Sequence, residues 1–233
     1  MIITRKKDRK ELLENVRRYK SFFLLGCSEC ATLCGTGGQE QLDELKGLLE
    51  SEGRAVAGAF VAKTGCQVLG TKVELKRFKE ELGKTDCVIV LSCGAGTQSA
   101  VEIFEDKAVY PSNDSMFLGN MTRLQMFDER CSLCGECILD KTGGICPVTA
   151  CPKGILNGPC GGTKDGHCEV SAEIPCAWVR IYERMEKIGR LEDFKAGTLA
   201  AKNWSASVKP RKLTARGVPE KPQASRGGRE EKK

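Results

Sequence analysis

The sequence contains one histidine, His167, and it lacks any long apolar run. No stretch approaches the roughly 18 consecutive apolar residues that a membrane-spanning helix needs, so we expect no membrane span. The beginning, MIITRKKDRKELLENVRRYK, has no apolar signal-peptide core, which favours a cytoplasmic protein. A single histidine also leaves little support for a Cys–His catalytic pair, and we expect His167 to lie in a surface loop.

Cysteine, by contrast, is abundant, with 14 among 233 residues. Disulfides persist mainly in oxidising compartments, so in a reducing compartment this many thiols are better explained as metal ligands. Because histidine is almost absent, any metal centre must be held essentially by cysteine. Thiolate ligands select zinc or iron–sulfur clusters over oxygen-preferring ions.

The net charge of +6 comes from the end of the chain, where residues 205–233 carry nine Lys/Arg and three Glu. This segment is rich in Pro, Gly and Ser and has few large apolar residues. Its composition predicts a basic flexible tail, either solvated or docked on a partner, in preference to a nucleic-acid contact. We therefore expect no nucleic-acid partner.

The first half of the chain alternates strand and helix patterns. The predicted strands cover residues 21–26, 54–62 and 86–94, and the predicted helices cover residues 7–19, 37–53, 71–83 and 97–106. Strands joined by helices of this length imply a parallel sheet covered on both faces. We predict an α/β fold, with a Rossmann-like parallel-sheet domain over residues 1–120 that carries one cluster.

The pattern changes after residue 120. Residues 131–176 hold eight cysteines among glycines, prolines and polar residues, without a sustained period. Such a segment cannot fold on burial alone, so bound metal would have to supply the missing stability. A helix predicted over residues 176–194 follows, and we assign residues 121–204 to a small irregular cysteine-rich domain with this C-terminal helix. Its apolar stripe favours core packing or a docking face, and consists of Trp178, Ile181, Tyr182, Met185 and Ile188.

The first group of thiols follows the predicted strands. GCSECATLCGTGG comes directly after the first strand, and two further cysteines follow the second and third strands. Ligands gather beyond the carboxyl ends of parallel strands, so these thiols can converge on one sheet edge. A C-x2-C-x3-C run plus one distant cysteine can hold a 4Fe–4S cluster. Our chosen ligands are Cys27, Cys30, Cys34 and Cys93, with Cys66 in reserve.

Two neighbouring features have other interpretations. Cys87 falls inside a strand, which favours a small buried apolar residue over a ligand. CGTGGQEQ resembles a phosphate-binding loop, but it lacks the G-x-G-x-x-G spacing and the Walker lysine. We expect its glycines to let backbone N–H groups approach cluster sulfurs instead.

The second group begins with C-x2-C-x2-C, which matches the ferredoxin run, and Cys–Pro pairs follow it. Eight thiols suffice for two four-thiolate sites, although the spacing does not divide them. The candidate cluster ligands here are Cys131, Cys134, Cys137 and Cys176. The candidate ligands of a further metal are Cys146, Cys151, Cys160 and Cys168.

The segment NGPCGG surrounds one of these thiols. Its glycines and Asn157 permit left-handed turns, and Pro159 stiffens the approach. We expect this backbone to present Cys160 to a metal while nearby N–H groups bond its sulfur.

Zinc is the rival occupant, because four-cysteine zinc sites are common. Zinc-ribbon knuckles usually come as paired C-x2-C, which the last four candidate thiols do not form. We expect two or three 4Fe–4S clusters, with one zinc in place of a cluster as the alternative.

Residues 127–170 followed by PCAWVRIYERM resemble the cysteine-rich C-terminal domain of methylenetetrahydrofolate reductase. Together with GCSECATLCGTGG and LSCGAGTQ, they are similar to the small iron–sulfur subunit that accompanies the flavin-containing reductase subunit in acetogenic bacteria. The resemblance covers roughly residues 10–195 and is most specific at NGPCGG and CEV.

This resemblance implies an electron-transfer and assembly subunit that is not itself the folate-reducing catalyst. Its clusters would accept electrons from ferredoxin or a heterodisulfide-reductase-like module and pass them to FMN on the partner flavoprotein, which reduces methylene-tetrahydrofolate to methyl-tetrahydrofolate. The FMN would be bound only by the partner, since this chain is too short for an additional eight-fold barrel. The competing hypothesis is a redox-silent, zinc-binding structural subunit of the same kind of complex.

Overall fold

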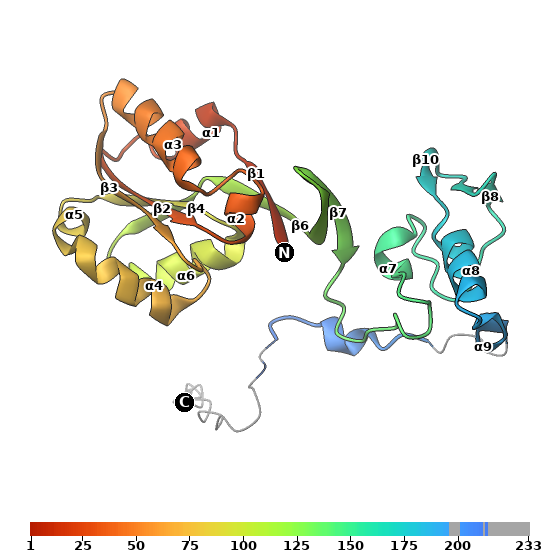
Figure 1. Ribbon diagram of the computed structural model, residues 1–233. Helices are drawn as coiled ribbons and strands as arrows, with labels where there is room; N and C mark the ends of the chain where they lie inside the picture. Colours follow the sequence, from red (N-terminus) through yellow and green to blue (C-terminus); the bar gives the residue numbers. More distant parts are fainter. Residues whose placement is uncertain (196–200, 212, 214–233) are drawn as a thin grey trace, which may run out of the picture.

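The computed structural model describes residues 1–195, 201–211 and 213 (Figure 1). Its strands are β1 (Ile2–Lys6), β2 (Ser21–Cys27), β3 (Ala55–Ala62), β4 (Cys87–Leu91), β5 (Ala108–Pro111), β6 (Asn113–Arg123), β7 (Met126–Cys131), β8 (Thr163–Lys164), β9 (His167–Cys168) and β10 (Ser171–Pro175). Its α-helices are α1 (Arg9–Asn15), α2 (Cys30–Leu33), α3 (Gln39–Ser51), α4 (Val68–Leu75), α5 (Lys79–Gly83), α6 (Gly94–Ile103), α7 (Pro147–Ala150), α8 (Ala177–Lys187) and α9 (Leu191–Lys195). Two 3-10 turns, η1 (Lys76–Phe78) and η2 (Trp204–Ser207), complete the described elements.

A four-stranded parallel sheet forms the centre of the N-terminal half, in the order β3-β2-β4-β5. This confirms the predicted α/β class and the three predicted strands. The two inner strands, β2 and β4, are buried throughout nearly their whole length. Burial on both faces explains why their sequences, FFLL and CVIVL, are continuously apolar instead of alternating.

Helices cover both faces of this sheet (Figure 1). On one face α1 and α3 contribute Leu12, Leu42 and Leu49 to a buried cluster with side chains of β2 and β4. On the other face Leu75 of α4 and Ala100 of α6 belong to a second buried cluster. The sheet is thus fixed from both sides, and its strand ends are held in place.

The helix predicted over residues 71–83 is interrupted. It begins earlier, as α4, turns through η1 and ends as α5. The turn brings the ring of Phe78 to 5.5 Å from that of Phe23 and 5.2 Å from that of Phe60. Packing of this ring against the sheet offsets the loss of regular helical hydrogen bonds.

A second sheet, in the antiparallel order β1-β6-β7, was not expected from the sequence. Much of β6 is intermediate or exposed, so it lacks the strong apolar pattern that reveals a buried strand. This sheet links the α/β half to the cysteine-rich part (Figure 1). The domain boundary predicted at residue 120 falls inside β6.

The cysteine-rich part contains α7, α8, α9 and a small sheet in the order β10-β9-β8. Trp178, Ile181 and Met185 of α8 are buried together, so this portion of the predicted stripe is core. Tyr182 is 43% exposed and does not share that role. The helix predicted to reach residue 194 ends earlier, because Gly189 adopts a left-handed conformation with φ of 69°.

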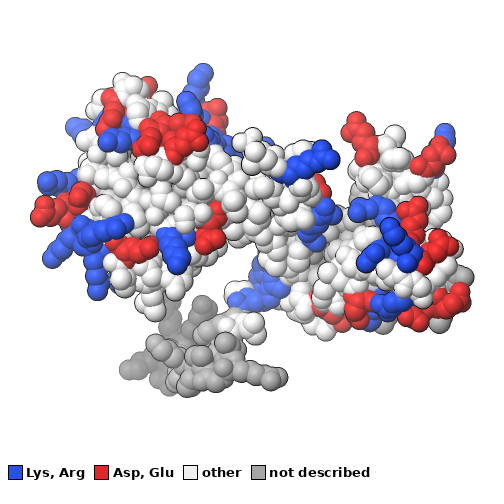
Figure 2. All heavy atoms as spheres, in the orientation of Figure 1, with Lys and Arg blue, Asp and Glu red and all other residues white. Residues whose placement is uncertain are grey.

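Charges of both signs are interspersed over the face shown in Figure 2. Within the described residues, no helix has the length and apolar character needed to cross a bilayer. Of the predicted tail, only residues 205–211 and 213 lie in the part of the chain that the structure describes.

Candidate metal centres

The first group of thiols lies at the carboxyl edge of the parallel sheet. Cys27 is the last residue of β2, and Cys93 follows β4 and caps the N-terminus of α6. These two strands are neighbours, while their other partners, β3 and β5, lie on opposite sides. Such a reversal of strand order opens a crevice at the carboxyl ends, where open α/β sheets bind ligands.

Cys66 lies in the loop after β3, at the same end of the sheet. Burial raises the pKa of its thiol, and the thiols of Cys93, Cys27 and Cys30 raise it further because like charges would repel. The backbone N–H of Gly65 donates to Cys27 Sγ at 3.4 Å. The thiols of Cys27, Cys30 and Cys93 thus lie near enough to Cys66 to act on its charge.

Cys34 is directed elsewhere. It follows α2, and its thiol lies 4.0 Å from the carbonyl oxygen of Ile2 in β1. Cys34 is one of the predicted ligands and Cys66 the reserve, and the thiols that act on Cys66 are those of Cys93, Cys27 and Cys30.

Cys87 is fully buried in the core beside α1 and α3, which confirms its interpretation as a packing residue. Burial raises the pKa of this thiol to about 12. The thiol therefore stays protonated near neutral pH, which is the opposite of what a metal ligand needs.

The glycines of CGTGG serve the packing of the loop against the sheet. A Cβ atom on Gly37 would lie 2.1 Å from the carbonyl oxygen of Leu91 in β4. The Gly37 carbonyl in turn accepts a hydrogen bond of 3.0 Å from the N–H of Cys27. A separate backbone N–H, that of Gly65, donates to Cys27 Sγ.

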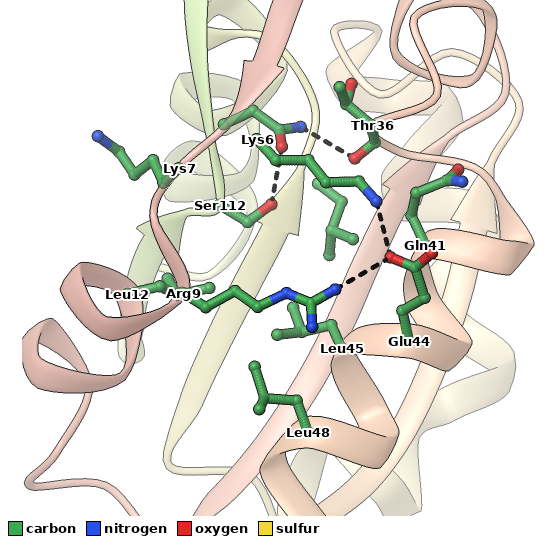
Figure 3. Close-up of a pocket in the computed structure, with 12 residues that line it drawn as sticks. Lys6, Lys7, Arg9, Leu12, Thr36, Gln41, Glu44, Leu45, Leu48 and Ser112 are labelled. Carbon is green, nitrogen blue, oxygen red and sulfur yellow. Dashed lines mark hydrogen bonds and ion pairs between the residues drawn. The ribbon is translucent and has the colours of Figure 1, made fainter.

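A small cavity of about 40 Å³ lies beside this loop, between β1, α1 and α3 (Figure 3). Its cations already have partners: Lys6 Nζ is 2.7 Å and Arg9 Nη2 is 3.7 Å from the carboxylate of Glu44, and Lys7 Nζ is 2.7 Å from Asp114. The hydrogen bond from Lys6 lowers the pKa of Glu44. A volume that fits only a few water molecules gives no support to nucleotide binding at this loop.

The second group surrounds a much larger cavity, of about 310 Å³, in the cysteine-rich part. All three cysteines of the C-x2-C-x2-C run line it, and so does Cys146. Cys146 caps α7, and Pro147 occupies the first turn of that helix. Our sequence-based grouping placed Cys176 with the run, whereas the cavity has Cys146 in that position.

Residues 131–137, which we call the cysteine loop, border this cavity. Left-handed backbone conformations shape this loop. Leu133 and Gly135 have φ of 55° and 85°, and the N–H of Leu133 donates to Cys131 Sγ at 3.4 Å. Burial raises the pKa of Cys134, but hydrogen bonds from Lys202 and from the backbone of Glu136 outweigh burial, so the pKa of this thiol is lowered. A lowered pKa favours the thiolate that binds metal.

The remaining four cysteines lie around α8 and the small sheet. Cys151 and Cys176 pack against the buried cluster of Trp178, and Cys168 is buried in β9. Cys160 is exposed, and its pKa is lowered by the N–H of Gly162 and by Lys153.

Two basic side chains that the sequence reasoning did not select lie against these thiols: Lys153 beside Cys160 and Lys202 beside Cys134. Lys202 lies 68 positions from its thiol, and no spacing rule signals such a contact. His167 is exposed as predicted, although it lies in β9, and its Nδ1 is 2.9 Å from the carbonyl oxygen of Asp165.

In residues 1–195, 201–211 and 213, no three Cys, His, Asp or Glu side chains are already arranged to hold a single metal ion. The thiols instead border the sheet edge and the larger cavity. Soft sulfur donors with almost no histidine suit zinc or iron–sulfur clusters.

The fold and its thiols define an α/β protein that carries a cysteine-rich unit after its parallel sheet. Residues 110–205 of the chain match the family described as "Methylene-tetrahydrofolate reductase C terminal". The match includes all eight cysteines from Cys131 to Cys176, and it relates this part of the chain to methylenetetrahydrofolate reductases. No curated protein and no solved structure matches the chain.

Proposed function

We propose that this chain is the electron-transfer and assembly subunit of a methylenetetrahydrofolate reductase complex. It would relay electrons through 4Fe–4S clusters to the FMN of a partner flavoprotein. The donor would be ferredoxin or a heterodisulfide-reductase-like module. Reduction of methylene-tetrahydrofolate to methyl-tetrahydrofolate, which takes two electrons and two protons, would occur on the partner.

The observation that carries this proposal is the cavity bordered by Cys131, Cys134, Cys137 and Cys146. Three closely spaced thiols followed by a more distant Cys–Pro reproduce the ligand types and order of a ferredoxin cluster loop. The cavity volume of about 310 Å³ and its sulfur-rich border suit a compact cluster of iron and sulfide. A bound 4Fe–4S cluster takes up and returns one electron at a time.

The sheet edge supports a second centre. Cys27, Cys30 and Cys93 act electrostatically on the Cys66 thiol there, and the N–H of Gly65 already bonds the Cys27 sulfur. Hydrogen bonds to cluster sulfurs tune reduction potentials, so the Gly65 N–H is suited to that role. Two centres on separate sheets suit a relay better than a single structural site does.

The match of residues 110–205 links the proposal to folate reduction. The proposal assigns both the flavin and the folate to the partner flavoprotein. The remaining four thiols of the cysteine-rich part, Cys151, Cys160, Cys168 and Cys176, would hold a third cluster or one zinc.

The test is the content of iron, acid-labile sulfide and zinc in the full chain purified without oxygen, with absorption spectra before and after dithionite. Iron and sulfide in multiples of four, with a broad visible band that bleaches on reduction, are expected. Zinc alone in a colourless protein would overturn the relay and leave the structural, redox-silent subunit as the function.

A further inference from the structure

The chain returns to its cysteine loop after α9. Residues 201–211, which we call the C-terminal strap, run beneath the loop that follows β7 (Figure 1). The strap contains η2, whose first turn is capped by Asn203, because the Asn203 side chain accepts a hydrogen bond of 3.0 Å from the N–H of Ser205. The sequence analysis placed most of this segment in a flexible tail, so its docking was not expected.

Specific contacts hold the strap against the loop. The N–H of Asn203 donates to the carboxylate of Glu136 at 2.6 Å, and Arg211 Nη1 donates to the carbonyl of Leu133 at 2.7 Å. Gly135 lies directly against Ala206, where a Cβ atom would overlap the backbone. Contacts with Leu133, Gly135 and Glu136, made by backbone and side chains, show that strap and loop fit each other.

Lys202 is the most enclosed charged group of the strap, with a side chain that is only 2% exposed. Its ammonium donates to the carbonyl of Glu136, lies 3.9 Å from the Glu136 carboxylate and lies 5.5 Å from the centre of the Trp204 ring. Lysine is almost never fully buried unless its charge has partners.

The ammonium shares a partner with a thiol. The Cys134 thiol donates to the carbonyl oxygen of Glu136 at 3.5 Å, and the Lys202 ammonium donates to the same oxygen. The strap therefore places a positive charge beside a candidate ligand of the larger cavity.

We propose that Lys202 is a positioning residue, which the C-terminal strap holds beside Cys134 so that its buried positive charge stabilises the reduced form of the centre that Cys134 helps to hold. This inference rests on the proposed function. Reduction adds one electron to the cluster, and a nearby positive charge lowers the free energy of the more negative state. Glu136 offsets part of this charge, but its carboxylate also accepts the N–H of Asn203, so the compensation is incomplete.

The test compares Lys202→Met, which removes the charge and keeps most of the stem, with Lys202→Arg, which keeps the charge. Lys164→Met, at an exposed lysine of the same part of the chain, is the matched control. On full-length protein we would titrate each cluster with dithionite and measure the rate at which bound metal passes to a chelator.

In Lys202→Met the reduction potential of one cluster should fall by about 59 mV. At a fixed potential this lowers the ratio of reduced to oxidised cluster about tenfold for a one-electron couple. Metal release should accelerate severalfold. Lys202→Arg and Lys164→Met should stay near the wild type in both measurements.

Each outcome decides the matter. Full iron content with unchanged potentials and release rate in Lys202→Met would overturn the inference and leave the proposed function intact. If the wild type holds only zinc, the proposed function fails, and an unchanged zinc release rate in Lys202→Met would overturn this inference separately. If Lys202→Met cannot retain metal, retention by Lys202→Arg supports the role of the charge, and loss in both variants contradicts it.

Discussion

A Cβ atom on Gly135 would lie 2.5 Å from the carbonyl oxygen of Ala206 and 2.7 Å from its Cβ atom. The two residues are far apart in the sequence, yet their contact joins the cysteine loop to the C-terminal strap. Gly135 also has φ of 85°, a conformation that other residues rarely adopt. One glycine thus provides both the turn within the loop and the space for the strap.

Gly135→Ala should detach the strap. The substitution adds a collision with backbone atoms to the roughly 1–2 kcal/mol that a left-handed residue costs. Gly144→Ala is the matched control, because Gly144 has φ of 86° but nothing lies within 4 Å of its Cβ position. Hydrogen exchange over residues 201–211 should accelerate at least about tenfold in Gly135→Ala only, and equal exchange in the two variants would contradict the contact.

Cys146→Ser should remove the same metal centre as Cys134→Ser, because both thiols border one cavity. Cys176→Ser should leave that centre in place, because Cys176 packs against the core of α8 instead. Iron content and the electron paramagnetic resonance signals of the reduced protein would separate the variants. Loss of the same signal in Cys176→Ser and not in Cys146→Ser would restore the grouping expected from the sequence.

The central sheet was predictable because β2 and β4 are continuous apolar runs between helix patterns. The sheet of β1, β6 and β7 was not predictable, since β6 and β7 are largely exposed or partly exposed and β1 pairs with a strand more than a hundred positions away, as Ile2 with Leu118. Local patterns do not encode such pairing.

Some candidate ligands were likewise predictable from local spacing, whereas other contacts depend on the tertiary fold. Spacing identified the run at Cys131 and the convergence at Cys27 and Cys93, because both follow local rules. The placement of Cys66 beside the other thiols depends on how β3 ends relative to β2, and the approach of Lys202 depends on the path of the whole cysteine-rich part. Neither contact can be predicted from the spacing of nearby residues.

At the sheet edge, Cys66→Ser should remove one metal centre, whereas Cys34→Ser should retain that centre. Cys66 interacts with three neighbouring thiols, while the Cys34 thiol is directed at the carbonyl of Ile2. A serine hydroxyl is a poor substitute for a thiolate toward iron or zinc. Metal analysis of both variants tests this, and loss of metal from Cys34→Ser alone would reinstate Cys34 as the ligand.

Because of Cys87, the protein should become less stable as the pH rises above 9.0, the usual pKa of a cysteine thiol. Burial raises the folded-state pKa to about 12, so between these values the thiol ionises in the unfolded chain and stays neutral in the folded one. The unfolded state then binds fewer protons, and the free energy of unfolding falls with pH. The measurement is denaturant unfolding of the wild type and of Cys87→Ala from pH 8 to pH 11, compared as a difference because other thiols titrate in both proteins.

The stability of Cys87→Ala should fall less steeply with pH than that of the wild type. Below pH 8 the variant should be less stable by about 1 kcal/mol, because a small cavity replaces the buried sulfur. Iodoacetamide should also label Cys160, which is exposed and has a lowered thiol pKa, in metal-free folded protein and reach Cys87 only after unfolding, since the thiolate is the reactive form. Parallel pH profiles, or rapid labelling of Cys87 in the folded state, would show that this thiol is not held neutral in the core.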